Sequence, residues 1–139
     1  MKSRHMARET ALQILYQFDG TAQSVEAQNI SIDLTRYYQH FAVSEPLREF
    51  IGQLVAGTLC NIKNIDGILE KHASNWKLSR MSAIDRNLLR MATYEMVILK
   101  DVHPSVIIDE AIELAKNFGT EDTPGFVNGI LDSINNAAA

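Results

Sequence analysis

The stretch Thr123-Pro124-Gly125-Phe126-Val127-Asn128-Gly129-Ile130-Leu131 begins with the sequence signal of a helix N-terminus. Threonine before proline predicts that start, with Thr123 as the cap and Pro124 in the first turn, where a missing N–H costs nothing. Alanine at position 129 would favour the helix by roughly 1 kcal/mol over Gly129, so the glycine indicates close approach by another backbone or a ligand. We therefore expect a buried helix with something docked near it.

Helical periodicity covers most of the remaining sequence, and no segment has a convincing strand pattern. The apolar stripes and the start and stop signals predict helices over residues 6–19, 30–41, 44–72, 82–99, 103–118 and from 123 onward. The 44–72 stripe contains three glycines, so this helix is expected to kink or split. No linker or repeat interrupts the pattern, and residues 1–139 are expected to form a single all-α domain, a compact bundle of about seven helices.

Several helix ends have clear sequence signals. Ser82 with Asp85 resembles a capping box, His103-Pro104 opens the next helix, and Gly119 is expected to end that helix as a left-handed cap. The polar residues outside the apolar stripe of the 82–99 helix are expected to face mostly toward solvent. They are Asp85, Arg86, Asn87, Arg90 and Glu95.

The composition predicts an ordinary globular protein, with 46% hydrophobic residues and a formal net charge of −4. Cys60 is the only cysteine, which excludes an intramolecular disulfide and a cysteine-based zinc site. It lies in an apolar helical pattern, so we expect a buried thiol and a reducing, cytoplasmic setting. No apolar run reaches the roughly 20 residues that a membrane-spanning helix needs.

The sequence offers no arrangement typical of an enzyme. Its four histidines fall in four different predicted elements, and no two share a helical face as metal ligands would. Asp109, Glu110 and Glu113 fit an exposed helix face with Lys116 better than an acid–base pair. Gly-rich phosphate loops and a nucleophile elbow are absent. We expect no catalytic site, no metal and no cofactor, and we expect Met81, Met91 and Met96 to fill the core.

A net negative charge argues against a general nucleic-acid coating, so any phosphate-binding surface must be local. The candidate is the N-terminal segment, where Lys2, Arg4, His5 and Arg8 come before the first acidic residue, Glu9. A solvated tail is the alternative interpretation of this segment.

Four stretches of this chain resemble the NusB family of bacterial transcription antitermination factors, and the likeness covers nearly the whole length. They are Ala7-Arg8-Glu9-Thr10-Ala11-Leu12-Gln13 with Leu15-Tyr16-Gln17, Ile84-Asp85-Arg86-Asn87-Leu88-Leu89-Arg90 with Tyr94-Glu95, Asp109-Glu110-Ala111-Ile112-Glu113-Leu114-Ala115-Lys116, and Phe126-Val127-Asn128-Gly129-Ile130-Leu131-Asp132. The resemblance rests on their common order and spacing.

This resemblance implies a helical fold of two small packed sub-bundles and a role without catalysis. Family members pair with the ribosomal protein NusE, bind boxA RNA and join the elongating RNA polymerase, which suppresses termination, notably in ribosomal RNA transcription. By position, the residues implied to contact RNA are Arg4, His5, Arg8, Tyr16, Asp122 and Phe126. Those implied to face NusE are Ile84, Asp85 and Leu88.

The residues themselves make RNA binding physically reasonable. Single-stranded RNA is recognised by stacking its bases on aromatic rings and pairing their edges with polar groups, while cations hold the phosphates. Tyr16, Phe126 and Asn128 suit the first task, and Lys2 with the N-terminal arginines suits the second, although the two rings could instead be core. With about three cationic contacts, raising salt from about 50 to 200 mM should weaken binding roughly 20-fold. We expect weak intrinsic RNA binding that NusE rescues.

Two alternatives stay open from the sequence. A similar helical domain precedes certain RNA 5-methylcytosine methyltransferases, so the chain could be a fragment of one. It could also be a protein-only adaptor or a homodimer whose RNA patch is idle.

Overall fold

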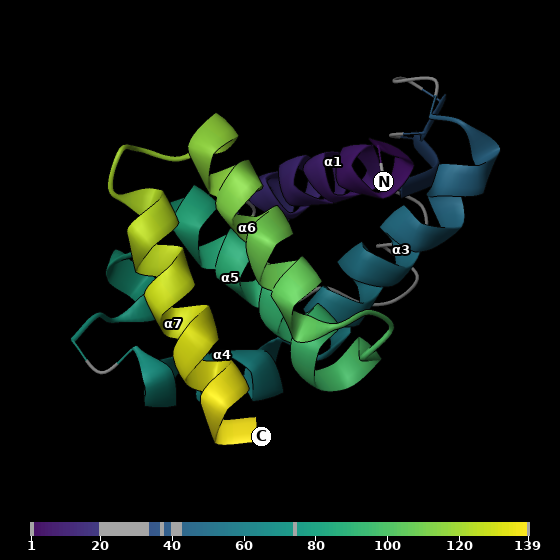
Figure 1. Ribbon diagram of the computed structural model, residues 1–139. Coiled ribbons are helices and arrows are strands. Elements are labelled where there is room, and N and C mark those ends of the chain that lie inside the picture. Colours follow the sequence, from purple (N-terminus) through teal and green to yellow (C-terminus); the bar gives the residue numbers. More distant parts are fainter. Residues whose placement is uncertain (1, 20–33, 37, 40–42, 74, 139) are drawn as a thin grey trace. The chain divides into compact units, whose positions relative to one another are not determined.

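The computed structural model describes residues 2–19, 34–36, 38–39, 43–73 and 75–138 (Figure 1). Helices and short connectors make up these residues, and no strand occurs within the described ranges. The fold class predicted from the sequence is therefore confirmed. The chain divides into two compact units, Met1–Cys60 and Asn61–Ala139, and each is described by itself below.

The first unit pairs α1 (Lys2–Asp19) with α3 (Glu45–Cys60), which pack against each other. The first helix begins before the predicted start at residue 6. Of the helix predicted over 30–41, residues 34–36 and 38–39 are helical, and the rest lies outside the described residues. The buried apolar side chains of α1 and α3 include Ala7, Ala11, Leu12, Leu15, Ile51, Leu54 and Val55.

The second unit contains the remaining elements. In chain order they are α4 (Ile62–His72), the 3₁₀ turn η1 (Leu78–Arg80), α5 (Ala83–Thr93), the π-helical segment η2 (Tyr94–Leu99), α6 (Pro104–Phe118) and α7 (Thr123–Ala138). Helices α6 and α7 run antiparallel and side by side, and both pack on α5 (Figure 1). Their shared core includes Leu88, Leu89, Met91, Ile107, Leu114, Val127 and Leu131. Met81, Met91 and Met96 are buried, as predicted.

The long helix predicted over 44–72 is split at Asn61 and at none of its glycines. Asn61 has φ −110° and ψ 18°, outside helical geometry, although its carbonyl still accepts the Ile65 N–H at 2.9 Å. Asparagine is common at helix ends, although the Asn61 side chain makes no capping hydrogen bond here. Cys60, the last residue of α3, is exposed, so the prediction of a buried thiol is wrong.

Two of the predicted helix starts are confirmed. Ser82 caps α5, and its hydroxyl accepts the Asp85 N–H at 3.1 Å. His103 caps α6, where its Nδ1 accepts the Ser105 N–H at 3.1 Å and Pro104 takes the first helical position. Both caps satisfy N–H groups that the first turn leaves without a helical partner.

The turn between α6 and α7 differs from the prediction at both ends. Gly119 is extended, with φ −94° and ψ −171°, so it is not a left-handed cap. A Cβ there would lie 2.5 Å from the Thr123 side chain, and this lack of space is what requires glycine. Thr123 is the first residue of α7 and not its cap, because the Asp122 carbonyl accepts the first helical bond, from the Phe126 N–H at 3.2 Å.

The Thr123 side chain ties α7 to α5. Its hydroxyl accepts the Thr120 N–H at 3.0 Å and donates to the Asp85 carboxylate at 2.9 Å. The residue is almost completely buried. A buried hydroxyl with both a donor and an acceptor satisfied fixes its surroundings without a desolvation penalty.

The polar residues of the 82–99 segment are more buried than predicted. Asn87 and Glu95 are buried, so their predicted exposure to water is wrong. The Asn87 amide donates to the Ala83 carbonyl at 2.8 Å, which offsets the cost of burying it. Glu95 lies in η2, whose wider π-helical turn changes which residues face the core. Burial raises the pKa of the neighbouring Tyr94, and the Glu95 charge adds to that rise.

Gly129 lies in the middle of α7, exposed, and a Cβ built there would have no atom of the chain within 4 Å. The close backbone approach inferred from the sequence is therefore absent among the described residues. We expect Gly129→Ala to raise the free energy of unfolding by about 1 kcal/mol, because alanine loses less backbone entropy in a helix. Urea unfolding followed by circular dichroism measures this change.

Two other glycines provide matched controls for that measurement. Gly67 on α4 is also exposed with an open Cβ position, so Gly67→Ala should stabilise to a similar extent. Gly119→Ala should destabilise, because its Cβ would overlap Thr123. Stabilisation at 119, or destabilisation at 129, would contradict this interpretation of the three sites.

Candidate nucleic-acid interface

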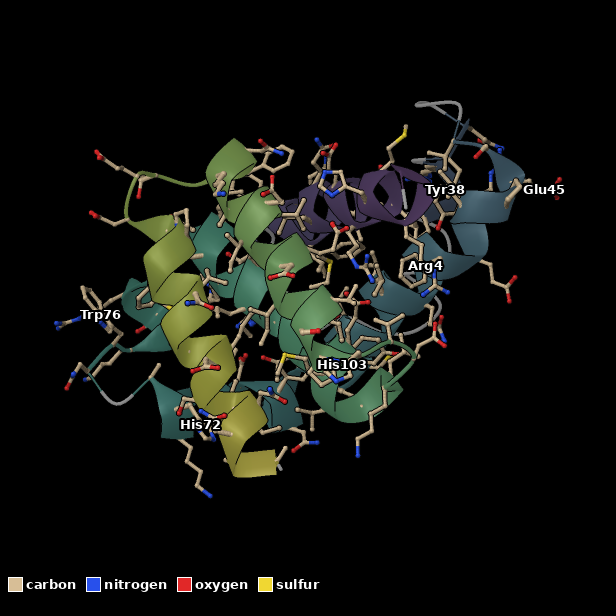
Figure 2. The ribbon with its side chains drawn as sticks, in the orientation of Figure 1. Arg4, Tyr38, Glu45, His72, Trp76 and His103 are labelled. Carbon is tan, nitrogen blue, oxygen red and sulfur yellow. The ribbon has the colours of Figure 1, made fainter. Side chains whose placement is uncertain are left out.

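The predicted basic segment forms the first turns of α1 and packs on α3. The Arg4 guanidinium lies 4.5 Å from the centre of the Phe50 ring, and that of Arg8 lies 5.4 Å from it (Figure 2 labels Arg4). A guanidinium over an aromatic ring is held by the ring quadrupole. Arg8 is only 3% exposed and packs against Phe50 in this conformation, so its predicted contact with RNA gains no support here and stays a prediction.

The other basic side chains of this turn are also engaged. His5 Nε2 lies 2.9 Å from the carboxylate of Glu9, one helical turn away. The first acidic residue of the chain therefore contacts a side chain of the basic segment. Lys2 belongs to the helix, but its side chain is outside the described part of the structure. Arg4 is half-buried and keeps some surface for a ligand. The solvated-tail alternative does not hold, since residues 2–10 are helical.

Tyr16, on the same helix, is 49% exposed. The alternative that this ring belongs to the core is therefore wrong. An exposed ring on a rigid helix can stack a base at little entropic cost.

The second unit presents another aromatic surface, where α7 begins. Phe126 is partly exposed, while Asp122 and Asn128 are exposed. The Phe126 ring meets Trp76 edge to face, with centroids 5.6 Å apart and an interplanar angle of 79°. Trp76 lies in the connector between α4 and η1, is 57% exposed, and projects outward from it in Figure 2. Trp76 is absent from the residues predicted to bind RNA, although the only tryptophan of the chain, set among polar residues, was the available signal.

A cavity of about 870 Å³ lies beside Trp76, between its connector, α4 and α5. Four cationic side chains line it, Lys77, Arg80, Arg86 and Arg90, together with the two carboxylates of Asp66 and Glu70.

Two of these arginines form the structural wall of the cavity. Arg90 makes a two-point ion pair with Asp66, with Nε–Oδ1 at 2.8 Å and Nη2–Oδ2 at 2.9 Å. Arg86 donates to the carbonyls of Leu78 and Met81, both at 2.9 Å, and so holds the connector in place. Charged donors in fixed geometry make hydrogen bonds stronger than neutral ones.

The predicted NusE-facing residues lie on α5. Ile84 and Asp85 keep part of their surface, and Asp85 is held by Thr123. Leu88 is 0% exposed, so its side chain offers a partner no surface in this conformation, and its predicted contact with NusE gains no support here. Helices α4, α6 and α7 all pack on α5, and Leu88 lies in the buried core of this unit.

Among the described residues, no group of three or more histidine, cysteine, aspartate or glutamate side chains could hold a metal ion. His72 is hydrogen-bonded to Ser133 at 2.9 Å, and His103 caps its helix. Among the helices that the structure describes, none is long and apolar enough to cross a bilayer.

The helical fold and its exposed rings, polar groups and cations define the class of the molecule: a helical binding domain. Comparison with known proteins then gives the family. The NusB family model matches residues 5–136. The chain belongs to the NusB family, and it is a non-catalytic transcription antitermination protein. The resemblance noted in the sequence is confirmed.

Individual relatives agree with this assignment. The chain is 44% identical to the transcription antitermination protein NusB of Syntrophotalea carbinolica, over 94% of this chain and 90% of that protein. It is 45% identical to NusB of Desulfitobacterium hafniense, over 95% and 87% of the two chains. Both relatives are transcription antitermination proteins and neither is a methyltransferase, which does not support the enzyme alternative.

Solved structures show the same fold. NusB of T. maritima is 34% identical, with a TM-score of 0.83 over 96% of this chain and 90% of that one. A crystal structure of the antitermination factors NusB and NusE in complex with double-stranded RNA includes a chain that is 28% identical. Its TM-score is 0.85 over 99% of this chain and 98% of that one.

Proposed function

We propose that the chain, acting as one RNA- and protein-binding domain, pairs with NusE, binds boxA-type single-stranded RNA and joins the elongating RNA polymerase in the cytoplasm. There it suppresses termination, notably in ribosomal RNA operons. The observation that carries the proposal is the likeness to the chain found with NusE and RNA in a solved structure. That RNA is double-stranded, whereas exposed Tyr16 and partly exposed Phe126 suit unpaired bases, because rings cannot stack on bases inside a duplex.

The RNA-facing residues in this proposal come from both units. Tyr16 and Phe126 stack bases, while Asn128 and Asp122 pair with base edges. Arg4 supplies charge to the phosphates, together with His5 and Lys2. Arg8 is left out of this set, because its burial against Phe50 gives it a packing role.

The partner surface in this proposal is the part of α5 that includes Ile84 and Asp85. Asp85 is positioned by the hydroxyl of Thr123, so Thr123→Val should weaken NusE binding without removing the carboxylate. A protein-only adaptor is the competing function, and RNA binding separates the two.

An RNA gel shift with and without NusE tests the proposal. We expect weak binding of a boxA RNA by the chain alone, because few cations are available, and tighter binding by the complex with NusE. Equal affinity of the chain and the complex would contradict the proposed rescue. No shift in either sample would leave the adaptor function.

Removing the Arg4 charge should change the salt dependence of RNA binding. We expect Arg4→Ala to reduce the slope of log affinity against log salt by about 0.7, the loss of roughly one phosphate contact on a single strand. Arg48→Ala is the matched control, because Arg48 stacks on Tyr38 at 5.5 Å and is outside the proposed set. Equal slopes for wild type and Arg4→Ala would remove Arg4 from the interface.

A further inference from the structure

We propose that Trp76, Lys77 and Arg80 form a second RNA subsite, which takes one nucleotide flanking the boxA segment. Trp76 stacks the base, and the two cations hold the adjoining phosphates. The proposal rests on the proposed RNA-binding function, since it extends the RNA path beyond Phe126.

The aromatic part of the subsite is continuous with the proposed interface. Trp76 and Phe126 touch edge to face, at 5.6 Å between centroids. A partner in this geometry can cover at most one of the two faces of the indole, and 57% of the residue is exposed. A nucleotide next to one stacked on Phe126 therefore meets a second ring, and successive bases on successive rings are the usual arrangement in single-strand binding.

The charge of the cavity beside Trp76 favours an anionic ligand. Its lining carries four cations and two carboxylates, in a chain whose formal net charge is −4. Asp66 is already neutralised by Arg90, and Arg86 is hydrogen-bonded to two carbonyls.

Lys77 and Arg80 are the cations left for a ligand. Both are exposed, and the structure shows no side-chain partner for either within the described residues. This local positive excess is complementary to phosphate and unfavourable for a basic peptide.

The wall of the cavity is rigid, which a specific subsite requires. The Arg86 hydrogen bonds hold the connector at Leu78 and Met81, and the Arg90–Asp66 pair joins α5 to α4. Lys77 and Arg80 are therefore presented from a fixed backbone, and less entropy is lost when they bind.

The test compares three RNAs on the complex with NusE: a boxA core, and the same core lengthened by about three nucleotides at its 5′ or its 3′ end. We expect one of the extensions to tighten binding about 5- to 150-fold, the range of one stacked base. Trp76→Ala should abolish that gain and leave the affinity for the core nearly unchanged, and Trp76→Phe should keep most of it.

The salt dependence of RNA binding by the Lys77→Ala, Arg80→Ala double variant is a second readout. A purely structural role of the two side chains would not change it. On the extended RNA this pair should lower the salt slope by about 1.4, the value for two phosphates. Lys63→Ala with Lys71→Ala removes two exposed charges from α4 outside the cavity and should leave the slope nearly unchanged.

The outcomes separate this proposal from the one on which it rests. If wild type binds the core but gains nothing from either extension, or if the variants keep the gain, the subsite is overturned and the proposed function stands. The Lys77→Ala, Arg80→Ala double variant could instead bind NusE more weakly and still gain affinity from the RNA extension. In that case the surface belongs to the protein partner and the subsite is overturned. If wild type binds none of the RNAs with NusE present, both proposals fail.

Discussion

Leu88→Ala is expected to lower the free energy of unfolding by about 2–5 kcal/mol, the largest stability change that we predict. The side chain is completely buried in the second unit, where α4, α6 and α7 pack on α5. Its removal therefore loses apolar burial and leaves a cavity that close-packed neighbours fill only in part. Urea unfolding monitored by circular dichroism, with the slope checked for two-state behaviour, measures the change.

An exposed apolar side chain gives the control for this experiment. Val106 on α6 is 46% exposed, and Val106→Ala should change stability by less than about 0.5 kcal/mol. If Leu88→Ala were as mild as Val106→Ala while NusE binding fell sharply, the burial of Leu88 would be contradicted. The residue would then belong to the partner face, as the sequence first suggested.

Phe126→Ala is expected to weaken boxA RNA binding by the complex with NusE about 5- to 150-fold. The loss of one base–aromatic stack is worth about 1–3 kcal/mol, and each 1.4 kcal/mol is tenfold in affinity. The change also removes the edge contact with Trp76, so stability must be measured on the same samples. Fluorescence anisotropy of a labelled RNA gives the affinity.

Aromaticity can be separated from size at this position. Phe126→Tyr keeps the ring and should bind RNA nearly as wild type, whereas Phe126→Leu keeps apolar bulk and should lose most of the affinity. Tyr16→Ala should show a loss of similar size, because its ring is exposed on α1. Leucine performing as well as phenylalanine would show that Phe126 packs against the protein and stacks no base.

Features set by neighbouring residues were predictable from the sequence. Ser82 and His103 cap their helices because a side chain reaches an N–H two or three residues ahead. The apolar stripes likewise place Leu12, Leu15 and Ile107 in the core, since helical periodicity alone decides their face.

Features that depend on distant contacts were not predictable. Arg8 is buried because Phe50, on another helix, lies under its guanidinium. Glu95 is buried in a π-helical segment, whose changed turn an α-helical pattern does not anticipate. Trp76 meets Phe126, which lies 50 residues further along the chain, only because folding brings the two rings together.

The central claim is that this chain, with NusE, recognises single-stranded RNA by sequence. The most direct measurement is the affinity of the complex for three RNAs: boxA, a scrambled strand of equal composition, and boxA annealed to its complement. We predict that single-stranded boxA binds about tenfold or more tighter than either competitor, a difference of at least about 1.4 kcal/mol. Equal affinity for all three, or preference for the duplex, would contradict it.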